Sequence, residues 1–371
     1  MRTRFLSRPS ADTVQVLGYL DAMWTRAIAA IDVEPIRPAM PTPQIDADDG
    51  GEALPSKWFE VHLFDPAEVR RTLALFDGKE QRAARTFLAD LSQLPSIRTL
   101  QPPPTVSAVR ELGKRFPNFA AVASLVETMT VLARAKPGSP LILPPLLLAG
   151  PPGVGKTAFA VAMAETLGVE WSLLGMSHAT AGFDLGGLDS GFGGGGPGLL
   201  TRQVALGDHP DRIVILDELD KTPAYSTSDP RGPLYELLEP STARQFMDDG
   251  VKVAIDMSHI HWIGTVNDVD SLDAALRSRF RIFHIDPPSP EQAKVIVQAI
   301  YTALLGGNAW GFRFSAQLPP DVVQALAAYS PREVRAGLVV ACARALQADR
   351  SHLRLEDLDP PPPGPRRMGF V

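Results

Sequence analysis

The stretch LLLAGPPGVGKTAFAVAMAETLG, residues 146–168, decides the fold. It joins an apolar run to a cluster of glycine and proline, and then to a segment of helical composition. The cluster GPPGVGKT fits the pattern G-x-x-x-x-G-K-[ST] of a phosphate-binding loop, which requires a strand before it and a helix after it. We therefore predict a nucleotide site where a parallel strand meets a helix. A chance glycine-rich turn is the alternative.

The residue types of this loop have a chemical purpose. Glycines let backbone N–H groups converge on phosphate oxygens, and the following helix turns its positive end toward the anion. Lys156 is placed to reach the β and γ phosphates, and the Thr157 hydroxyl to hold Mg²⁺. The residues predicted to bind the nucleotide are Gly150, Pro151, Pro152, Gly153, Val154, Gly155, Lys156 and Thr157.

Two further apolar runs end in polar residues. In RIVILDELDK, residues 212–221, a buried parallel strand ends at Asp217 and Glu218. Open α/β sheets place ligand groups at the carboxyl ends of strands. We expect Asp217 to hold Mg²⁺ through water and Glu218 to polarise the attacking water, although two exposed carboxylates could simply cap the strand. IHWIGTVNDVD predicts another strand ending at Asn267, which contacts the γ-phosphate, orients the water, or is a turn residue.

Composition limits the remaining possibilities. The chain has 371 residues, enough for about two or three domains. Its net charge of −6 gives no general electrostatic reason to bind nucleic acid. A single cysteine, Cys342, excludes an internal disulfide and lies in a helical, apolar setting typical of a core. No apolar run reaches the length of a membrane span, so we expect no membrane partner. The lack of a disulfide framework fits a reducing compartment, and we expect a cytoplasmic protein, with a transit peptide in the basic residues before Asp12 as the alternative.

Three segments together resemble a known family. LDELDK, then DPRGPLYELLEPSTARQFMDD, then DMSHIHWIGTVND resemble the AAA+ ATPases, and within them the ATPase module of the Lon proteases. The resemblance covers roughly residues 105–357. It implies a parallel P-loop sheet flanked by helices, a small helical lid, ATP and Mg²⁺ as cofactors, and a ring of identical subunits, most often six. RFPNFAAVASLVETMTVLA, residues 115–133, is placed by the resemblance where the family has its adenine-facing segment and first helix, although its aromatic side chains could instead be simple core.

The resemblance also implies roles for two arginines. In LRSRFRIF, Arg279 matches the arginine finger, which reaches the γ-phosphate of a neighbouring subunit, with Arg277 assisting. A fixed guanidinium stabilises charge on the transferring phosphoryl group; a solvated basic turn is the alternative. YSPREVRAGL resembles the second-sensor motif and places Arg332 toward the nucleotide, with Ser330 where the family usually has glycine.

GGLDSGFGGGGPGLL, residues 186–200, matches the family's first pore loop at Phe192 and Gly193. An aromatic side chain there can grip an extended polypeptide in the channel of the ring. Four consecutive glycines from Gly193 to Gly196 depart from the family pattern and raise the loop's conformational freedom. A flexible surface loop with an incidental phenylalanine is the alternative.

Proline-rich breaks at residues 35–55 and 101–104 suggest the domain boundaries. Residues 1–104 are expected to be mostly helical, with apolar residues at helical spacing over 66–94. Residues 105–287 form the large α/β domain, 288–358 the helical lid, and 359–371 a proline-rich tail.

Two main classes of function remain. Lon proteases carry a proteolytic domain after the ATPase module, whereas only residues 359–371 follow the lid here, so we expect no peptidase activity. The first class is an ATP-driven machine that remodels or translocates a protein; the second is a nucleic-acid-associated motor or loader. Net charge and Phe192 favour the first. A regulatory ATP-binding switch is a third possibility, but it would need neither Glu218 nor Arg279.

Overall fold

The computed structural model describes residues 59–76, 78, 81–136, 138–177, 181–189, 195–222 and 229–359. All of these residues belong to one compact unit, Pro55–Val371. A second unit, Met1–Leu54, lies outside the described residues.

A sheet of five parallel strands forms the centre of the described chain. Its order is β4 (Glu170–Gly175), β5 (Arg212–Asp217), β8 (His261–Val266), β3 (Leu146–Ala149) and β9 (Arg281–His284). Strands β3 and β8 are entirely buried, and β5 is buried except at its last residue. A parallel sheet is covered on both faces, which explains why these strands read as continuous apolar runs. The predicted α/β fold with a parallel P-loop sheet is confirmed.

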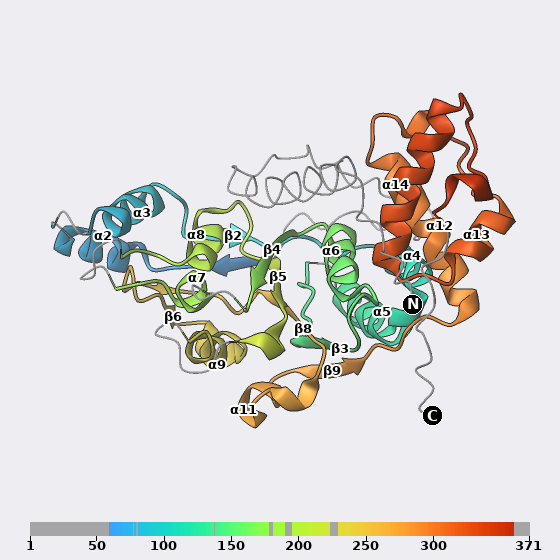
Figure 1. Ribbon diagram of the computed structural model, residues 1–371. Helices are drawn as coiled ribbons and strands as arrows, with labels where there is room; N and C mark the ends of the chain where they lie inside the picture. Colours follow the sequence, from blue (N-terminus) through green and yellow to red (C-terminus); the bar gives the residue numbers. More distant parts are fainter. Residues whose placement is uncertain are drawn as a thin grey trace, which may run out of the picture. The chain divides into compact units, whose positions relative to one another are not determined.

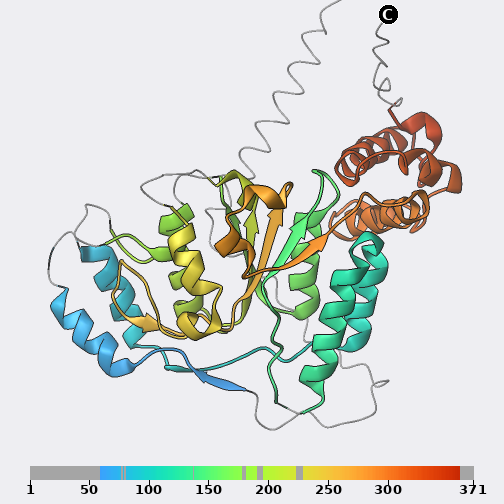
Figure 2. The same ribbon diagram turned by 90° about the horizontal axis from the view of Figure 1, so that it is seen from below.

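Alternate residues of the strands enter two different hydrophobic clusters. Leu147 and Leu216 belong to the first, whereas Leu148 and Ile215 belong to the second. The second cluster lies beneath α4 (Val106–Arg115), α5 (Ala120–Arg134) and α6 (Lys156–Leu167), and the first beneath α7 (Ala181–Gly186), α8 (Leu199–Leu206) and α9 (Arg231–Leu237). Figures 1 and 2 show the sheet between these two groups of helices.

The segment before the sheet folds onto the first cluster. Strand β1 (Glu60–His62) pairs antiparallel with β2 (Ile97–Thr99), and α2 (Pro66–Leu75) and α3 (Arg82–Ser92) lie between them in sequence. Val69, Phe87 and Leu91 are buried in the same cluster as the sheet residue Leu216. The helical spacing seen over residues 66–94 therefore gives two helices, and their apolar faces share a core with the sheet.

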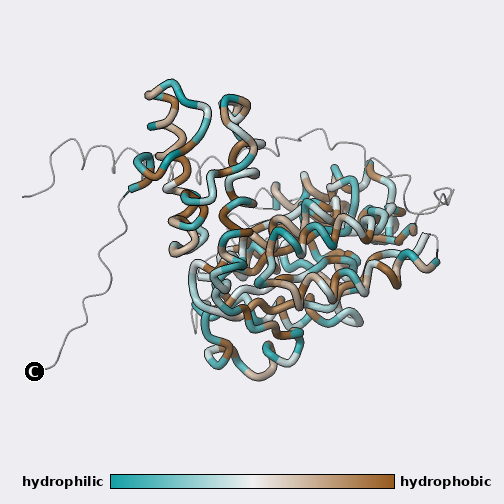
Figure 3. Tube along the Cα trace, turned by 90° about the vertical axis from the view of Figure 1, so that its right-hand side faces the viewer, coloured by the Kyte–Doolittle hydropathy of each residue, from teal (hydrophilic) through white to brown (hydrophobic). Residues whose placement is uncertain are grey.

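The lid has a hydrophobic cluster of its own. Helices α12 (Pro290–Gly306), α13 (Pro320–Leu326) and α14 (Pro331–Gln347) enclose Tyr301, Leu338 and Cys342, so the cysteine is the core residue that its sequence setting predicts. Serine residues cap both long helices: Ser289 with Gln292 for α12, and Ser330 with Glu333 for α14. In Figure 3 the turns of these helices alternate between hydrophobic and hydrophilic residues.

The remaining elements are short. They are α10 (Pro240–Ala243), α11 (Ala274–Arg277), the antiparallel pair β6 (Phe246–Met247) and β7 (Ala254–Ile255), and the 3₁₀ turns η3 (Pro117–Phe119), η4 (Leu219–Lys221), η5 (Val269–Ser271), η6 (Gly311–Arg313) and η7 (Leu355–Asp357). Within the described ranges, no single helix is both long and apolar enough to cross a membrane; α4 joined to the following helical segment passes that test only as a pair bent by 117°.

His261, the first residue of β8, gives the fold a measurable response to acid. Burial, together with the smaller effect of the neighbouring His259, lowers the pKa of His261 from 6.5 to about 4. The neutral imidazole thus stabilises the fold above pH 6.5, and this contribution is lost as the pH falls toward 4. Between pH 7 and pH 5 the loss amounts to about 2 kcal/mol.

We therefore expect His261→Leu to lose less unfolding free energy than the parent protein between pH 7 and pH 5. Urea unfolding at both pH values measures the difference. His62→Leu, the same change at an exposed histidine of β1, is the control and should follow the parent. Identical pH dependence in His261→Leu and the parent would contradict this account.

Candidate functional site

The carboxyl ends of three neighbouring strands bring the predicted site together. The phosphate-binding loop begins at Gly150, directly after β3, while Asp217 ends β5 and Asn267 follows β8. These strands are adjacent in the sheet, with Ala149 opposite Val266 and Leu216 opposite Gly264. The three polar segments therefore meet at one edge of the sheet, as the sequence predicts.

Glycine is required at defined points of the loop. Gly153 and Gly155 have φ angles of 85° and 99°, in the left-handed region that favours glycine, and Gly155 is the residue before α6. A Cβ atom at Gly150 would collide with the carbonyl oxygen of Ile285, which follows β9. The loop thus gains both its turn and its close packing against the sheet from residues without a side chain.

Lys156 is buried in this loop, with 8% of its surface exposed. Its Nζ donates to Gly150 O at 2.7 Å, Pro151 O at 3.1 Å and Asn267 Oδ1 at 3.0 Å. Burial lowers the pKa of Lys156, and the nearby carboxylates, Asp220 first, act in the opposite direction. Because an ammonium has three donors, the chain itself occupies all of them, and an incoming phosphate has to displace at least one carbonyl.

Thr157 and Asp217 meet directly. The Thr157 hydroxyl donates to Asp217 Oδ1 at 2.9 Å, which leaves the lone pairs of the threonine oxygen available. Mg²⁺ is bound in proteins by few protein oxygens together with waters and substrate phosphates. A hydroxyl and a carboxylate in contact fit that donor set. Over the described ranges, no cluster of three or more His, Cys, Asp or Glu residues could hold a metal ion.

Glu218 points to a different neighbour. Its backbone is left-handed, with φ 55° and ψ 46°, and its side chain is 43% exposed. Glu218 Oε1 accepts a hydrogen bond from Lys221 Nζ at 2.5 Å, and this bond raises the pKa of Lys221. The carboxylate therefore lies at the correct strand end but is paired within its own turn.

Two polar residues of the site were not selected from the sequence. Asp220 Oδ2 accepts the backbone N–H groups of Asn267 at 3.0 Å and Asp268 at 3.4 Å, so it fixes the segment that follows β8. Thr265, on β8, contacts Asp217 and the backbone of Glu218. Their signal in the sequence is their position: Asp220 is the third acidic residue of LDELDK, and Thr265 lies two residues before Asn267.

Comparisons with known proteins agree with this geometry. Residues 146–287 match the model of the ATPase family associated with various cellular activities (AAA). This part of the chain is an AAA+ ATPase module. Because the family is one of ATPases, the reaction assigned to the module is ATP hydrolysis.

The relatives extend the similarity beyond the module. Lon protease 4 of Sorangium cellulosum is 28% identical, over 65% of this chain and 30% of the relative's length. The Lon protease of Lawsonia intracellularis is 27% identical, over 69% of this chain and 32% of the relative's length. The chain thus spans about a third of the length of these relatives. A closed-state structure of Hsp104 with ATPγS and FITC casein, 17% identical, has a TM-score of 0.51 over 67% of this chain and 49% of that one, which shows the fold. The resemblance to the Lon ATPase module is confirmed.

The contacts of Arg279 are with residues outside its own phosphate-binding loop. Arg279 follows α11, where its Nη1 donates to Ala275 O at 2.7 Å and its guanidinium lies 5.1 Å from the centre of the Tyr235 ring. Its Nε is buried without a hydrogen-bond partner. Arg277 pairs with Asp270 at 2.9 Å. Neither contact involves a residue of the loop.

Arg332 lies in the first turn of α14, on the lid side of the loop. A Cβ atom at Gly153 would be 3.7 Å from the Cβ of Ser330, so the start of α14 is beside the phosphate-binding loop. Ser330 caps α14 through Glu333, which gives a structural reason for serine where the family usually has glycine. Arg332 itself is exposed.

The aromatic residues near the loop pack as core. Phe119 and Phe159 are fully buried and stacked, with ring centres 4.4 Å apart, and Phe116 meets both rings edge-on. Gln292 of the lid donates to Pro117 O at 3.2 Å, which ties α12 to the turn before these rings. Of the two alternatives, an adenine-facing segment or core, the packing of these rings corresponds to core.

Phe192 and Gly193 of the predicted pore loop lie outside the described residues. The two flanks are described: Leu188 and Gly196 form an antiparallel bridge, with N···O distances of 3.0 and 2.8 Å. The buried carboxylate of Asp248 accepts from Gly198 N at 2.8 Å and Gly250 N at 2.7 Å, and burial raises its pKa. The two ends of the loop segment are thus held together at its base.

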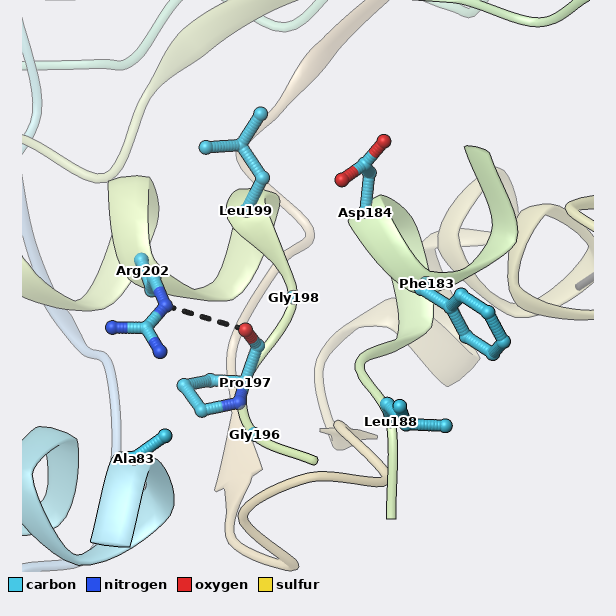
Figure 4. Close-up of a pocket in the computed structure, with 9 residues that line it drawn as sticks. All are labelled: Ala83, Phe183, Asp184, Leu188, Gly196, Pro197, Gly198, Leu199 and Arg202. Atoms are coloured by element: carbon cyan, nitrogen blue, oxygen red, sulfur yellow. Dashed lines mark hydrogen bonds between the residues drawn. The ribbon is translucent and has the colours of Figure 1, made fainter. Parts of the chain in front are cut away.

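A pocket of about 220 Å³ lies beside this base (Figure 4). Arg202 donates to Pro197 O at 3.3 Å in its wall, Ala83 of α3 lies on the same side as Arg202, and Phe183 and Leu188 lie on the other side. A Cβ atom at Gly196 would come within 3.0 Å of the Cβ of Ala83. Close packing therefore explains part of the glycine run. The residues lining the pocket are Ala83, Phe183, Asp184, Leu188, Gly196, Pro197, Gly198, Leu199 and Arg202.

We expect Lys156→Met to weaken binding of a fluorescent ATP analogue by at least about 100-fold, because the only ammonium in the loop is lost. Thermal unfolding should shift by only a few degrees, since losing three hydrogen bonds is offset by removing a buried charge. Lys114→Met, on the exposed surface of α4, is the matched control and should bind normally. Binding near the parent affinity in Lys156→Met would contradict this assignment.

Proposed function

We propose that this chain hydrolyses ATP with Mg²⁺ and, as a ring of six copies, uses that reaction to remodel or translocate a protein partner. One observation carries the proposal: Lys156, Thr157, Asp217 and Asn267, from three separate segments, form two hydrogen-bonded pairs, Lys156–Asn267 and Thr157–Asp217, at one edge of a parallel sheet. Groups that bind phosphate, metal and water in this type of site are thereby within reach of one small volume. Hydrolysis of peptide bonds is not part of the proposal.

Each residue has a role in this proposal. Lys156 exchanges its bonds to Gly150 O and Pro151 O for the β and γ phosphates, and the backbone from Gly150 to Thr157 surrounds them. Thr157 and Asp217 hold Mg²⁺, directly and through water. When bound, Mg²⁺ neutralises charge on the β and γ phosphates. Asn267 is already hydrogen-bonded to Lys156 and orients the attacking water or contacts the γ-phosphate.

Glu218 is the proposed base. A carboxylate at this position accepts a proton from the attacking water or polarises it. Its present partner is Lys221, so the Glu218 side chain has to leave that ion pair before it reaches the water. The pair is exposed on both sides, and such pairs contribute at most about 1 kcal/mol, so the release is not costly.

The ring is proposed from the two arginines. Arg279 is held by Tyr235 and Ala275, outside its own phosphate-binding loop, as expected of a residue that acts on the next subunit. Arg332 is exposed at the start of α14, near Gly153, and is proposed to contact the nucleotide from the lid.

The proposal also includes the domain organisation and the compartment. The domain boundaries are proposed at residues 104, 287 and 358. The protein is proposed to be cytoplasmic, because a chain with one cysteine and no internal disulfide fits a reducing compartment.

A shared site makes a specific prediction for mixed rings. Arg279→Ala and Glu218→Gln should each be nearly inactive, with losses on the order of 1,000-fold for the arginine. In a random equal mixture, about a quarter of the subunit boundaries pair an intact Glu218 with an intact Arg279. We therefore expect ATP hydrolysis to recover to a fraction of that order, measured by phosphate release. Mixed rings, verified by co-purification of two tags, that recover no activity would rule out a finger in trans.

A protein partner is favoured over nucleic acid for three reasons. The net charge is −6, Phe192 stands at the predicted pore position, and the relatives that align with the chain are named as proteases. The Hsp104 structure similar in fold also contains casein. We expect unfolded casein to stimulate ATP hydrolysis and DNA to leave it unchanged. The reverse result would favour the nucleic-acid motor.

Phe192→Ala should leave basal ATP hydrolysis nearly intact and remove the stimulation by casein, because the ring that grips the polypeptide is lost. Phe312→Ala, at a lid phenylalanine that is 85% exposed, is the matched control and should keep the stimulation. Equal stimulation in Phe192→Ala and the parent would show that the loop does not grip. A loss of stability of about 3–5 kcal/mol would instead identify Phe192 as a core residue.

A further inference from the structure

We propose that Thr265 is a positioning residue that holds the metal-side carboxylate of Asp217 and the backbone of Glu218 with a single hydroxyl group. The proposal rests on the function proposed above, and it adds a residue from β8 to the machinery of β5. Thr265 Oγ1 lies 2.6 Å from Asp217 Oδ1 and 3.0 Å from Glu218 N. Its side chain is 2% exposed.

The direction of both hydrogen bonds follows from chemistry. The backbone N–H of Glu218 can only donate, so Thr265 Oγ1 is the acceptor in that bond. The hydroxyl proton is then free to be donated to the Asp217 carboxylate, which can only accept when ionised. One oxygen atom therefore connects two successive residues of β5 and its turn, and it satisfies both without a second side chain.

Glu218 needs such a restraint. Its φ of 55° is in the left-handed region. Within the described chain, only two other non-glycine residues, Lys252 and Asp349, have a positive φ. For a residue with a side chain this conformation is unfavourable and persists only where the surroundings hold it. The Glu218 side chain is no anchor, because its partner Lys221 belongs to the same exposed turn. The Thr265 hydroxyl is the buried bond that fixes the Glu218 amide.

Asp217 gains a defined orientation from the same bond. Its Oδ1 accepts from Thr157 of α6 at 2.9 Å and from Thr265 of β8 at 2.6 Å. Two donors on one oxygen set the plane of the carboxylate and leave Oδ2 for metal-bound water. Thr265 is also stiff, because a β-branched side chain on a buried strand has a restricted χ1 angle. The position of the oxygen is therefore determined by the sheet.

Two substitutions separate the hydroxyl from the packing of the methyl group. Thr265→Val keeps the shape and loses both hydrogen bonds, whereas Thr265→Ser keeps the hydroxyl. We expect Thr265→Val to lower kcat at saturating Mg²⁺ and ATP by about 10- to 100-fold. It should also raise the Mg²⁺ concentration that half-saturates binding of a fluorescent ADP analogue. Affinity for the analogue in EDTA should stay within about twofold, because Lys156 and the loop are untouched.

Thr265→Ser should restore kcat and the Mg²⁺ dependence to within about threefold of the parent. Thr130 is a fully buried threonine of α5 whose hydroxyl donates to Val126 O of the same helix. Thr130→Val controls for the replacement of a buried threonine by valine and should match the parent in all three measurements. Equal loss in Thr265→Ser and Thr265→Val, or parent behaviour in Thr265→Val, would overturn the proposal.

If Thr265→Val does not fold by circular dichroism, Thr265→Ala and Thr265→Ser provide the same comparison, since both lose a methyl group and only alanine loses the hydroxyl. Equal kcat and equal Mg²⁺ dependence in this pair would also overturn it. A parent protein that binds the analogue with Mg²⁺ but does not hydrolyse ATP would disprove the proposed function. The Mg²⁺ dependence of analogue binding would still decide the role of Thr265.

Discussion

The carboxylate of Asp217 is the point on which the site depends. It lies at the end of β5, an interior strand of a sheet whose two faces are both covered. One of its oxygens accepts hydrogen bonds from the hydroxyl groups of Thr157 in α6 and Thr265 in β8. A carboxylate at the end of a buried strand is stable only with such partners. The strand order β4-β5-β8-β3-β9 supplies them, because β5 and β3 are both neighbours of β8. The strand order of the sheet therefore determines which side chains can hold the Asp217 carboxylate.

The sequence allowed the fold and the phosphate-binding loop to be predicted for physical reasons. Continuous apolar runs such as residues 213–216 are typical of strands covered on both faces, and the glycines before Lys156 mark a turn that only glycine permits. Side-chain pairing is less accessible to such reasoning. Thr265 lies inside an apolar strand and has no spacing rule, and its role depends on the register between β5 and β8. The role of Asp220 is inaccessible for the same reason, since its partner is a backbone N–H group 47 residues later in the chain.

The base of the predicted pore loop shows a second limit of sequence reasoning. Four glycines in a row suggest freedom of movement, yet Gly196 is paired with Leu188 and packs against Ala83. Asp248, from the β6 strand region, holds Gly198 and Gly250 although its burial disfavours the charged form. Long-range contacts such as these decide which glycines serve packing. They also place the α2–α3 segment, through Ala83, in contact with the base of that loop.

Three charged groups proposed to act in the site are paired with other residues of the chain. Lys156 directs its three donors at two carbonyls of its own loop and at Asn267, Glu218 is paired with Lys221, and Arg279 lies on Tyr235. Lys156, Glu218 and Arg279 thus each have a partner within the chain. For the buried Lys156, this pairing avoids an unpaired buried charge, which would be costly. In the proposed function, the phosphates of ATP replace existing hydrogen bonds of Lys156. The affinity for ATP therefore reflects the difference in free energy between the bonds that are lost and the bonds that are formed. Thr265 and Asp220 differ from these groups, because their partners are backbone N–H groups and the Asp217 carboxylate. We infer that they form the fixed part of the site, beside which Lys156 and Glu218 exchange their partners for the nucleotide and the attacking water.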